Sequence, residues 1–212
     1  MSKAGLRSTV NKALRSLSQD ELERQSSTIC ESLAPLLAGY GSVACYMSMD
    51  SCEVKTGQIL EQLFDAGKEV YLPRCTSTRE TGQVVLREGV NSHPQLTFHR
   101  MVSLQQVQQL QPSGKYQLRE PVKETPAPLP PTLDAILVPG VAFSLGNGAR
   151  MGHGAGFYDD YIHRSLHYNK ARPLLVGLAL KEQIVGHIPM EPHDFPMDCI
   201  VAGDGTVRWF NR

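Results

Sequence analysis

The sequence predicts an α/β fold: a mostly parallel, open sheet with helices on both faces, three layers in all, formed as a single domain over residues 1–212. Two observations predict it. Apolar strand candidates alternate with helical patterns along the chain, which is typical of a parallel sheet. The 212 residues are 41% hydrophobic, which suffices for one sizeable core.

The first half of the chain carries most of the helical patterns. Apolar residues recur at helical spacing from Leu6 to Leu17, and Ser18 with Glu21 forms a capping box for the next helix. The expected elements are helices at 3–17, 18–37, 55–66 and 103–110, and strands at 43–47, 69–72, 84–87 and 97–100. The strand–helix–strand order in this half is the unit from which parallel sheets are built.

The second half of the chain follows a proline-rich connector. Residues 111–132 hold six prolines and show little periodicity, so we expect an irregular connector within the domain. Beyond it we expect strands at 135–138, 174–180, 199–202 and 207–210, and a helix at 157–167.

Composition excludes several classes of function. The 21 Lys and Arg residues balance 21 Asp and Glu residues, and a neutral chain is a poor candidate for nucleic-acid binding. No apolar run approaches the ~20 residues that span a bilayer, so we expect no membrane partner. Because no heptad pattern or strongly apolar surface helix is evident, we expect a monomer.

Two features of the sequence indicate different cellular compartments. Five cysteines without a C-x-x-C pair predict neither a disulfide framework nor a zinc site, and they fit the reducing cytoplasm. Residues 1–17, however, contain Lys3, Arg7, Lys12 and Arg15 and no acidic side chain. A mitochondrial transit peptide has the same composition. We favour the cytoplasm and leave the mitochondrion as the alternative.

The most informative segment is the glycine-rich stretch 148–160. Its four glycines, at 148, 152, 154 and 156, let the backbone approach a ligand without an intervening Cβ. The N–H groups of such a loop, followed by a helix N-terminus, form an anion site. We call residues 152–156 the glycine loop. It is neither a Walker A loop nor the dinucleotide fingerprint, because no G-x-x-x-x-G-K-[ST] occurs and the spacing is G-x-G-x-G.

Acidic side chains suggest further roles. Asp159 and Asp160 fall in the first turn of the predicted helix, where acids either stabilise the helix dipole or bind Mg²⁺ beside phosphates. Asp194 or Asp198 could supply a second carboxylate. Glu53 follows a predicted strand, at the edge where open α/β sheets bind ligands, although a surface loop residue is the simpler interpretation.

Eight segments, in the right order along the chain, resemble the 5-formyltetrahydrofolate cyclo-ligase family, also called 5,10-methenyltetrahydrofolate synthetase. The resemblance is greatest to its eukaryotic, and within that its fungal, branch. The segments are Lys3-x-x-x-Arg7, Tyr46 to Met49 with Glu53-Val54-x-Thr56, Leu72-Pro73-Arg74, Tyr116-x-Leu118-x-Glu120-Pro121, Val138 to Phe143, Arg150 to Asp159, Gly177 to Gln183, and Ile188-Pro189 with His193-Asp194 and Asp198. Each segment is modest alone, and the ordered set is specific.

The resemblance implies an enzyme that closes a ring in 5-formyltetrahydrofolate to give 5,10-methenyltetrahydrofolate, using ATP as co-substrate and Mg²⁺. The γ-phosphoryl group of ATP moves to the formyl oxygen, N10 attacks the activated carbon, and phosphate departs. Such chemistry needs positioning and charge neutralisation more than a protein nucleophile. Folate and ATP are therefore the expected small-molecule partners.

The resemblance also implies roles for single residues. Arg150 and Tyr158 would be catalytic, Asp159 and Asp194 would bind Mg²⁺, and Met47 and Glu53 would line the folate site. The implied ATP-binding residues are Lys3, Arg7, Arg150, Met151, Gly152, His153, Gly154, Ala155, Gly156, Phe157 and Tyr158. Of these, His153, Gly154, Ala155, Gly156 and Phe157 would also face the folate.

Two positions of the loop depart from the family pattern. The family commonly has Arg and Lys where this chain has His153 and Ala155, and often Asp where it has Ser144. A histidine is mostly neutral above its reference pKa of ~6.5, and an alanine carries no charge. Up to two positive charges of the family's loop are therefore missing from this one. A folate-binding protein without ATP turnover is therefore an alternative function. An oxidoreductase with a bound dinucleotide is a third, opposed by the missing fingerprint.

Overall fold

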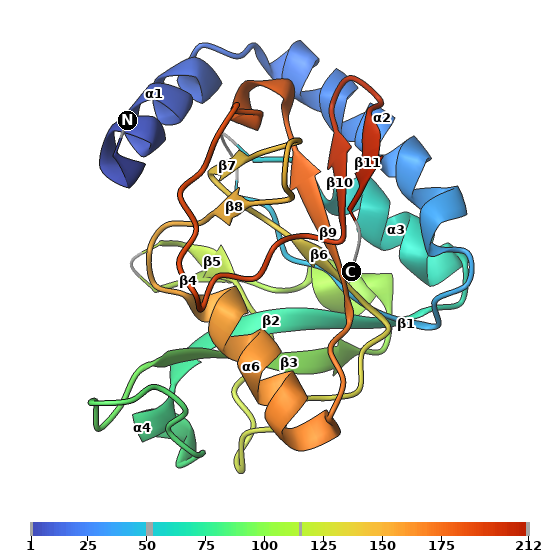
Figure 1. Ribbon diagram of the computed structural model, residues 1–212. Helices are drawn as coiled ribbons and strands as arrows, with labels where there is room; N and C mark the ends of the chain where they lie inside the picture. Colours follow the sequence, from blue (N-terminus) through green and yellow to red (C-terminus); the bar gives the residue numbers. More distant parts are fainter. Residues whose placement is uncertain (1, 50–52, 115, 211–212) are drawn as a thin grey trace.

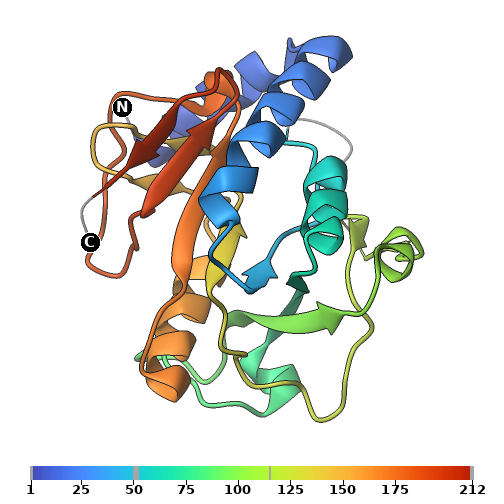
Figure 2. The same cartoon turned by 90° about the vertical axis from the view of Figure 1, so that its right-hand side faces the viewer.

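A seven-stranded sheet runs through the computed structural model, which describes residues 2–49, 53–114 and 116–210. Its strands are β1 (Ser42–Ala44), β2 (Glu69–Ser77), β3 (Pro94–Met101), β6 (Ala135–Val138), β9 (Leu174–Ala179), β10 (Cys199–Ala202) and β11 (Val207–Trp209). Their order is β11-β10-β9-β6-β1-β2-β3. Neighbours from β10 to β2 pair in parallel, and both edge strands pair antiparallel. The mostly parallel sheet is therefore confirmed (Figures 1 and 2).

Helices cover both faces of this sheet, as the sequence predicts. They are α1 (Lys3–Arg15), α2 (Gln19–Leu37), α3 (Gly57–Asp65), α4 (Thr78–Thr81), α5 (Leu104–Gln108), α6 (Phe157–Asn169) and the 3-10 turn η1 (Lys181–Gln183). Apolar residues of α1, α2, α3 and α5 form one core with one face of the sheet. Residues of α6, including the fully buried Tyr161, form a second core with the opposite face. The three-layer α/β/α arrangement is confirmed.

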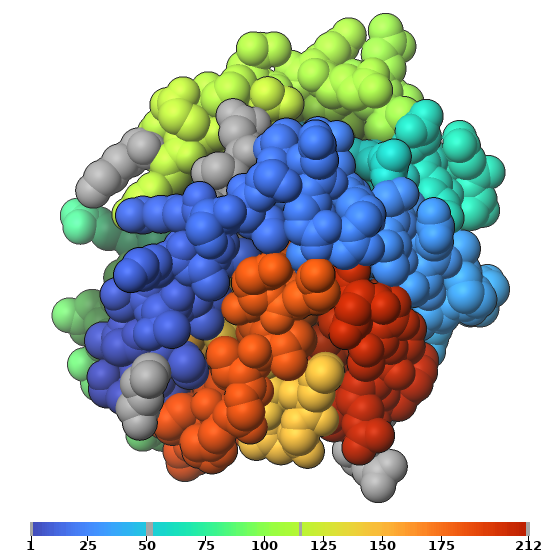
Figure 3. Space-filling model, turned by 90° about the horizontal axis from the view of Figure 1, so that it is seen from above, coloured from blue at the N-terminus to red at the C-terminus, as the bar shows by residue number. Residues whose placement is uncertain are grey.

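The N-terminal helix is part of the folded body. Val10 and Leu14 of α1 are buried in the first core, and the Ser2 hydroxyl accepts a hydrogen bond from the backbone N–H of Gly5 at 3.2 Å. At the next helix, the Ser18 hydroxyl accepts from the N–H of Glu21, as the capping-box pattern predicts. In the view of Figure 3, α1 lies beside the chain that leads from η1 to β10.

One predicted strand is wrong. Residues 84–87 form no strand, because their backbone groups bond to side chains instead of a neighbouring strand. The carbonyl of Val84 accepts from Arg164 at 2.9 Å, and the N–H of Leu86 donates to His93 at 3.3 Å. This irregular segment joins the short helix α4 to β3.

Strand β2 is longer than predicted, because Pro73 does not end it. The pairing of β1 with β2 stops at Tyr71, so Pro73 lies beyond the stretch in which both sides of β2 are paired. There it needs no N–H for a second neighbour, and it pairs only with Phe98 of β3.

Two small hairpins escape prediction. One, β4 (Pro112–Ser113) with β5 (Leu118–Arg119), lies inside the proline-rich connector. The other, β7 (Ala142–Phe143) with β8 (Arg150–Met151), leads into the glycine loop. Strands of two residues are too short to show a periodic pattern. Within the described residues, four cysteines are free and no helix is both long and apolar enough to cross a membrane.

Candidate active site

The glycine loop connects hairpin β7–β8 to helix α6. Gly156 caps α6 at a φ of 67°, and Gly154 has a φ of 104°, both in the region that L-residues with side chains rarely adopt. A Cβ at Gly156 would also lie 3.0 Å from Nη2 of Arg87. Glycine is therefore required here by backbone conformation and, at Gly156, by the close approach of an arginine.

The loop turns its carbonyl groups toward arginines and leaves its N–H groups unpaired. Arg7 donates from Nε to the carbonyl of Gly152 at 3.0 Å, and Arg87 donates from Nη2 to the carbonyls of Ala155 and Gly156 at 3.1 and 2.9 Å. Across the described ranges, no group accepts a hydrogen bond from the N–H of His153 or its three successors in the loop. Such a row of free donors before a helix N-terminus suits a polyanion.

Arg150 lies beneath the loop at the start of this row. Its Nη2 donates to Oδ2 of Asp159 at 2.9 Å, and its guanidinium carbon is 5.5 Å from the centre of the Tyr158 ring. The side chain is 7% exposed, and its Nε has no hydrogen-bond partner among the described atoms. A buried, unpaired N–H is costly, so a further partner for this donor would stabilise the site.

Asp159 and Asp194 come to one corner of the site. Oδ1 of Asp159 accepts from the N–H of Phe195 at 3.1 Å, which places it beside the residue that follows Asp194. Asp194 accepts from Lys3 at 3.2 Å, and Lys3 also binds Glu191 at 3.0 Å. Both predicted metal ligands are thus paired with cations, and the described residues contain no cluster of three His, Cys, Asp or Glu able to hold a metal.

Two other candidate carboxylates are structural. Asp198 accepts a bidentate pair from Arg172 at 2.8 and 2.7 Å and a further bond from the N–H of Leu175, so it holds strand β9. The buried Asp160 accepts from Arg164 at 2.8 Å, one turn along α6. Neither carboxylate faces the loop as a free ligand.

Glu53 and Tyr158 lie half-buried near the neighbouring strand end, with their carboxyl and phenol groups largely withdrawn from water. Oε2 of Glu53 accepts from the N–H of Met49 at 3.0 Å, and burial raises the pKa of the Glu53 carboxyl to about 7. Burial also raises the pKa of Tyr158, which the nearby charge of Arg150 lowers and that of Glu53 raises. The phenol of Tyr158 therefore stays protonated, and Glu53 titrates near neutrality.

Met47 lies at the same end of the sheet, where it lines a pocket beside hairpin β4–β5. The lining residues are Met47, Ser48, Met49, Pro112, Tyr116, Gln117, Leu118 and Arg119. A pocket with a sulfur-containing and aromatic lining suits a flat, partly apolar ring.

His153 adds no charge to the loop. Although the residue as a whole is exposed, desolvation of its ring, followed by the charge of Arg7, lowers the pKa of the imidazole below its ordinary value. The side chain is therefore neutral at pH 7. The positive charges at the loop belong to Arg7, Arg87 and Arg150.

Sequence reasoning missed two residues of this site. Arg87 lies in the segment wrongly predicted as a strand, and no motif marks it. Tyr46 has a buried hydroxyl without a hydrogen-bond partner among the described atoms, and burial, followed by the charge of Glu53, raises its pKa. Arg74 donates to the carbonyl of Pro121 and Ser144 to that of Gly186, so each of these side chains has a partner within the fold.

Comparison with known proteins supports the resemblance seen in the sequence. Residues 1–203 match the model of the 5-formyltetrahydrofolate cyclo-ligase family. The chain is 49% identical over 211 residues to the 5-formyltetrahydrofolate cyclo-ligase of Saccharomyces cerevisiae, covering 97% of each chain. It is 31% identical to that of Escherichia coli, covering 93% of this chain and 97% of the relative.

Solved structures agree. The chain superposes on the Aquifex aeolicus 5,10-methenyltetrahydrofolate synthetase with a TM-score of 0.71 and 27% identity, covering 100% of this chain and 95% of that one. Because the match extends over fold, sequence and order of motifs, the chain belongs to the 5-formyltetrahydrofolate cyclo-ligase family.

Proposed function

We propose that the protein converts 5-formyltetrahydrofolate to 5,10-methenyltetrahydrofolate with consumption of ATP. A bond forms between the formyl oxygen and the γ-phosphorus, and ADP leaves. N10 then attacks the formyl carbon and loses its proton, and phosphate leaves with the former formyl oxygen. The observation that carries this proposal is the row of unpaired loop N–H groups between Arg7, Arg87 and Arg150, in a chain of this family.

The loop and Arg150 would hold the triphosphate. The N–H groups of residues 153–156 and the N-terminus of α6 provide neutral donors, and the unpaired Nε of Arg150 provides a charged one. Lys3 and Arg7 approach from α1. Donors fixed before the reaction stabilise charge that develops at the transferred phosphoryl group, because they need no reorganisation at that moment.

Asp159 and Asp194 fit a magnesium ion in number and chemistry. Mg²⁺ beside phosphates commonly uses one or two carboxylates, with waters and phosphate oxygens as its other ligands. A carboxylate offers about four acceptor sites, so Asp159 can keep its bond to Phe195. When bound, the ion would neutralise charge on the phosphates. Lys3 and Arg150 would then exchange a carboxylate partner for a phosphate one.

Glu53, with Met47, would bind the folate. With a pKa of about 7, the Glu53 carboxyl exists in both protonation states at neutral pH. In its charged form it accepts N–H donors of the pterin. Tyr158, protonated beside Arg150, would face the formyl group and donate to its oxygen.

A folate-binding protein without turnover is the second candidate function, favoured only by the neutral His153 and Ala155. The comparisons favour catalysis, because relatives spanning yeast, mouse and bacteria carry the enzyme's name. We place the protein in the cytoplasm as a monomer. A relative named as mitochondrial exists in Arabidopsis thaliana, but α1 packs on the core and reaches the site, which supports a working role for residues 3–15.

The test is growth of the methenyl-folate absorbance band with purified protein, 5-formyltetrahydrofolate, Mg²⁺ and ATP. We expect growth that depends on ATP. A matched reaction without ATP is the control. Folate binding by calorimetry without any growth of the band would support the binding protein instead.

A further inference from the structure

Of the arginines that donate to the glycine loop in the described part of the chain, Arg87 belongs to none of the segments resembling the family. It is held in place by contacts of two of its guanidinium nitrogens. Its Nη2 donates to the carbonyls of Ala155 and Gly156, at the C-terminal end of the loop. Its Nε lies 3.9 Å from Oδ1 of Asp160, whose side chain is 1% exposed. Two carbonyls and a buried carboxylate thus fix the direction of this guanidinium.

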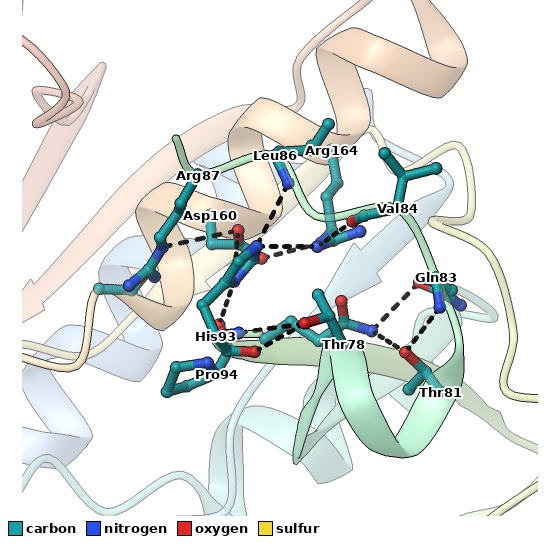
Figure 4. A network of polar contacts seen from close by, with 12 residues as sticks. Thr78, Thr81, Gln83, Val84, Leu86, Arg87, His93, Pro94, Asp160 and Arg164 are labelled. Carbon is teal, nitrogen blue, oxygen red and sulfur yellow. Dashed lines mark hydrogen bonds and ion pairs between the residues drawn. The ribbon is translucent and has the colours of Figure 1, made fainter. Parts of the chain in front are cut away.

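The irregular segment that carries Arg87 is itself anchored in a buried polar network (Figure 4). Arg164, fully buried, joins Asp160 to the carbonyl of Val84. His93 accepts at Nε2 from the N–H of Leu86, and its Nδ1 lies 3.3 Å from Asp160. Because Nε2 receives a donor, the hydrogen of a neutral ring must be on Nδ1, toward Asp160 and the carbonyl of Pro94. These contacts therefore hold in place the backbone of the segment that carries Arg87.

The peptide geometry gives these contacts a consequence for the loop. In a trans peptide the carbonyl of one residue and the N–H of the next point in opposite directions. By engaging the carbonyls of Ala155 and Gly156, Arg87 turns the N–H groups of Gly156 and Phe157 away from itself. Arg7 does the same for the N–H of His153, through the carbonyl of Gly152.

We propose that Arg87 is a positioning residue of the nucleotide site, which holds the second half of the glycine loop in its anion-binding conformation and brings a positive charge to it. This inference rests on the proposed binding of ATP phosphates by the loop. Ala155 has no charge and His153 is neutral, so the cations around the loop must come from other segments. Arg7 reaches the first half of the loop and Arg87 the second.

The experiment compares Arg87→Ala and Arg87→Lys with Arg79→Ala in steady-state turnover. Arg79, an exposed residue of α4, makes none of these contacts and controls for the loss of one charge. We expect Arg87→Ala to raise KM for ATP about tenfold, the low end for a hydrogen bond involving a charged group, because Arg87 is partly exposed. The KM for 5-formyltetrahydrofolate should rise much less than the KM for ATP, and the thermal midpoint should stay near that of the parent. Arg87→Lys should recover part of the ATP affinity.

The proposal is overturned if Arg87→Ala leaves KM for ATP unchanged, or if both KM values and the thermal midpoint shift together, since that is a purely structural effect. The variant Arg7→Ala distinguishes a failure of the role of Arg87 from a failure of the proposed nucleotide site. If Arg7→Ala raises KM for ATP and Arg87→Ala does not, only the role of Arg87 fails. If neither variant changes KM for ATP, the loop does not bind the nucleotide.

Discussion

Arg150 donates a hydrogen bond of 2.9 Å to Asp159, and this pair closes the glycine loop at its base. The two residues lie on either side of the loop, at the end of hairpin β7–β8 and in the first turn of α6. Both side chains are mostly buried. The loop therefore connects two ends that this ion pair holds in place. The same two side chains are the ones proposed to bind phosphate and magnesium in the reaction.

Replacing Arg150 tests whether this pair acts in catalysis. We expect Arg150→Ala to lower kcat/KM by about 10²-fold or more, the usual effect of removing a fixed donor to developing charge. Arg150→Lys keeps the charge but loses the planar guanidinium with its several fixed N–H donors, so it should recover little. ATP-dependent growth of the methenyl band measures both. Activity near the parental level in Arg150→Ala would exclude a catalytic role.

Removing the N-terminal half of α1 tests the contribution of this helix to ATP binding. Deleting residues 1–8 removes Lys3 and Arg7, and the buried Val10 and Leu14 remain to hold the helix. We expect KM for ATP to rise about tenfold, since a bond involving a charged group is lost. The KM for folate should not change. The double variant Lys12→Ala, Arg15→Ala removes two exposed charges from the same helix as a control. Unchanged turnover in the deletion would contradict the role of α1.

Glu53 predicts a specific dependence of stability on pH. Burial raises its pKa to about 7 in the folded protein, against an ordinary value of 4.5. The folded state therefore binds more protons between these values, and stability falls as pH rises through that window. The cost is absent below about pH 4.5 and reaches up to about 3 kcal/mol above pH 7.

The variant Glu53→Gln removes this titration. It should be more resistant to urea than the parent at pH 8, and the difference should shrink toward pH 5. It should also bind 5-formyltetrahydrofolate more weakly at pH 8, where the parent carboxyl is charged. A stability difference that is constant from pH 5 to pH 8 would show that Glu53 is not buried as described.

The central strands of the sheet could be predicted from sequence because they are continuous apolar runs. Residues 135–138 and 174–179 are buried throughout, and such runs need no tertiary information to be recognised. Segment 84–87 is different. Its backbone is satisfied by the side chains of Arg164, 80 residues away, and His93, beyond the end of the segment, so no pattern within residues 84–87 could show that it is not a strand.

The site, like the sheet, has parts that the local sequence predicts and parts that only the folded chain brings together. The glycine loop and its following helix are local, and the sequence predicts both. Arg87 approaches the loop across 68 residues of chain, and only the folded structure brings them together. The neighbouring aspartates were indistinguishable in sequence, since either could stabilise the helix dipole or bind a cation. Their separate partners, Arg150 and Arg164, depend on which side of α6 each faces.

These two aspartates give the sharpest paired prediction. Asp160 is buried with Arg164, and its removal leaves that guanidinium uncompensated, so Asp160→Asn should lower the free energy of unfolding by about 3–5 kcal/mol. Asp159 is less buried than Asp160, at 15% against 1% exposed, so Asp159→Asn should cost less stability than Asp160→Asn and most of the ATP-dependent turnover. Urea denaturation and the methenyl assay, run on both variants, separate the effects. If Asp159→Asn instead unfolds the protein and Asp160→Asn only lowers turnover, the assignment of one carboxylate to the site and the other to the network is reversed. An equal loss of stability in both would mean that Asp159, like Asp160, serves the fold, and magnesium binding would then have to depend on Asp194.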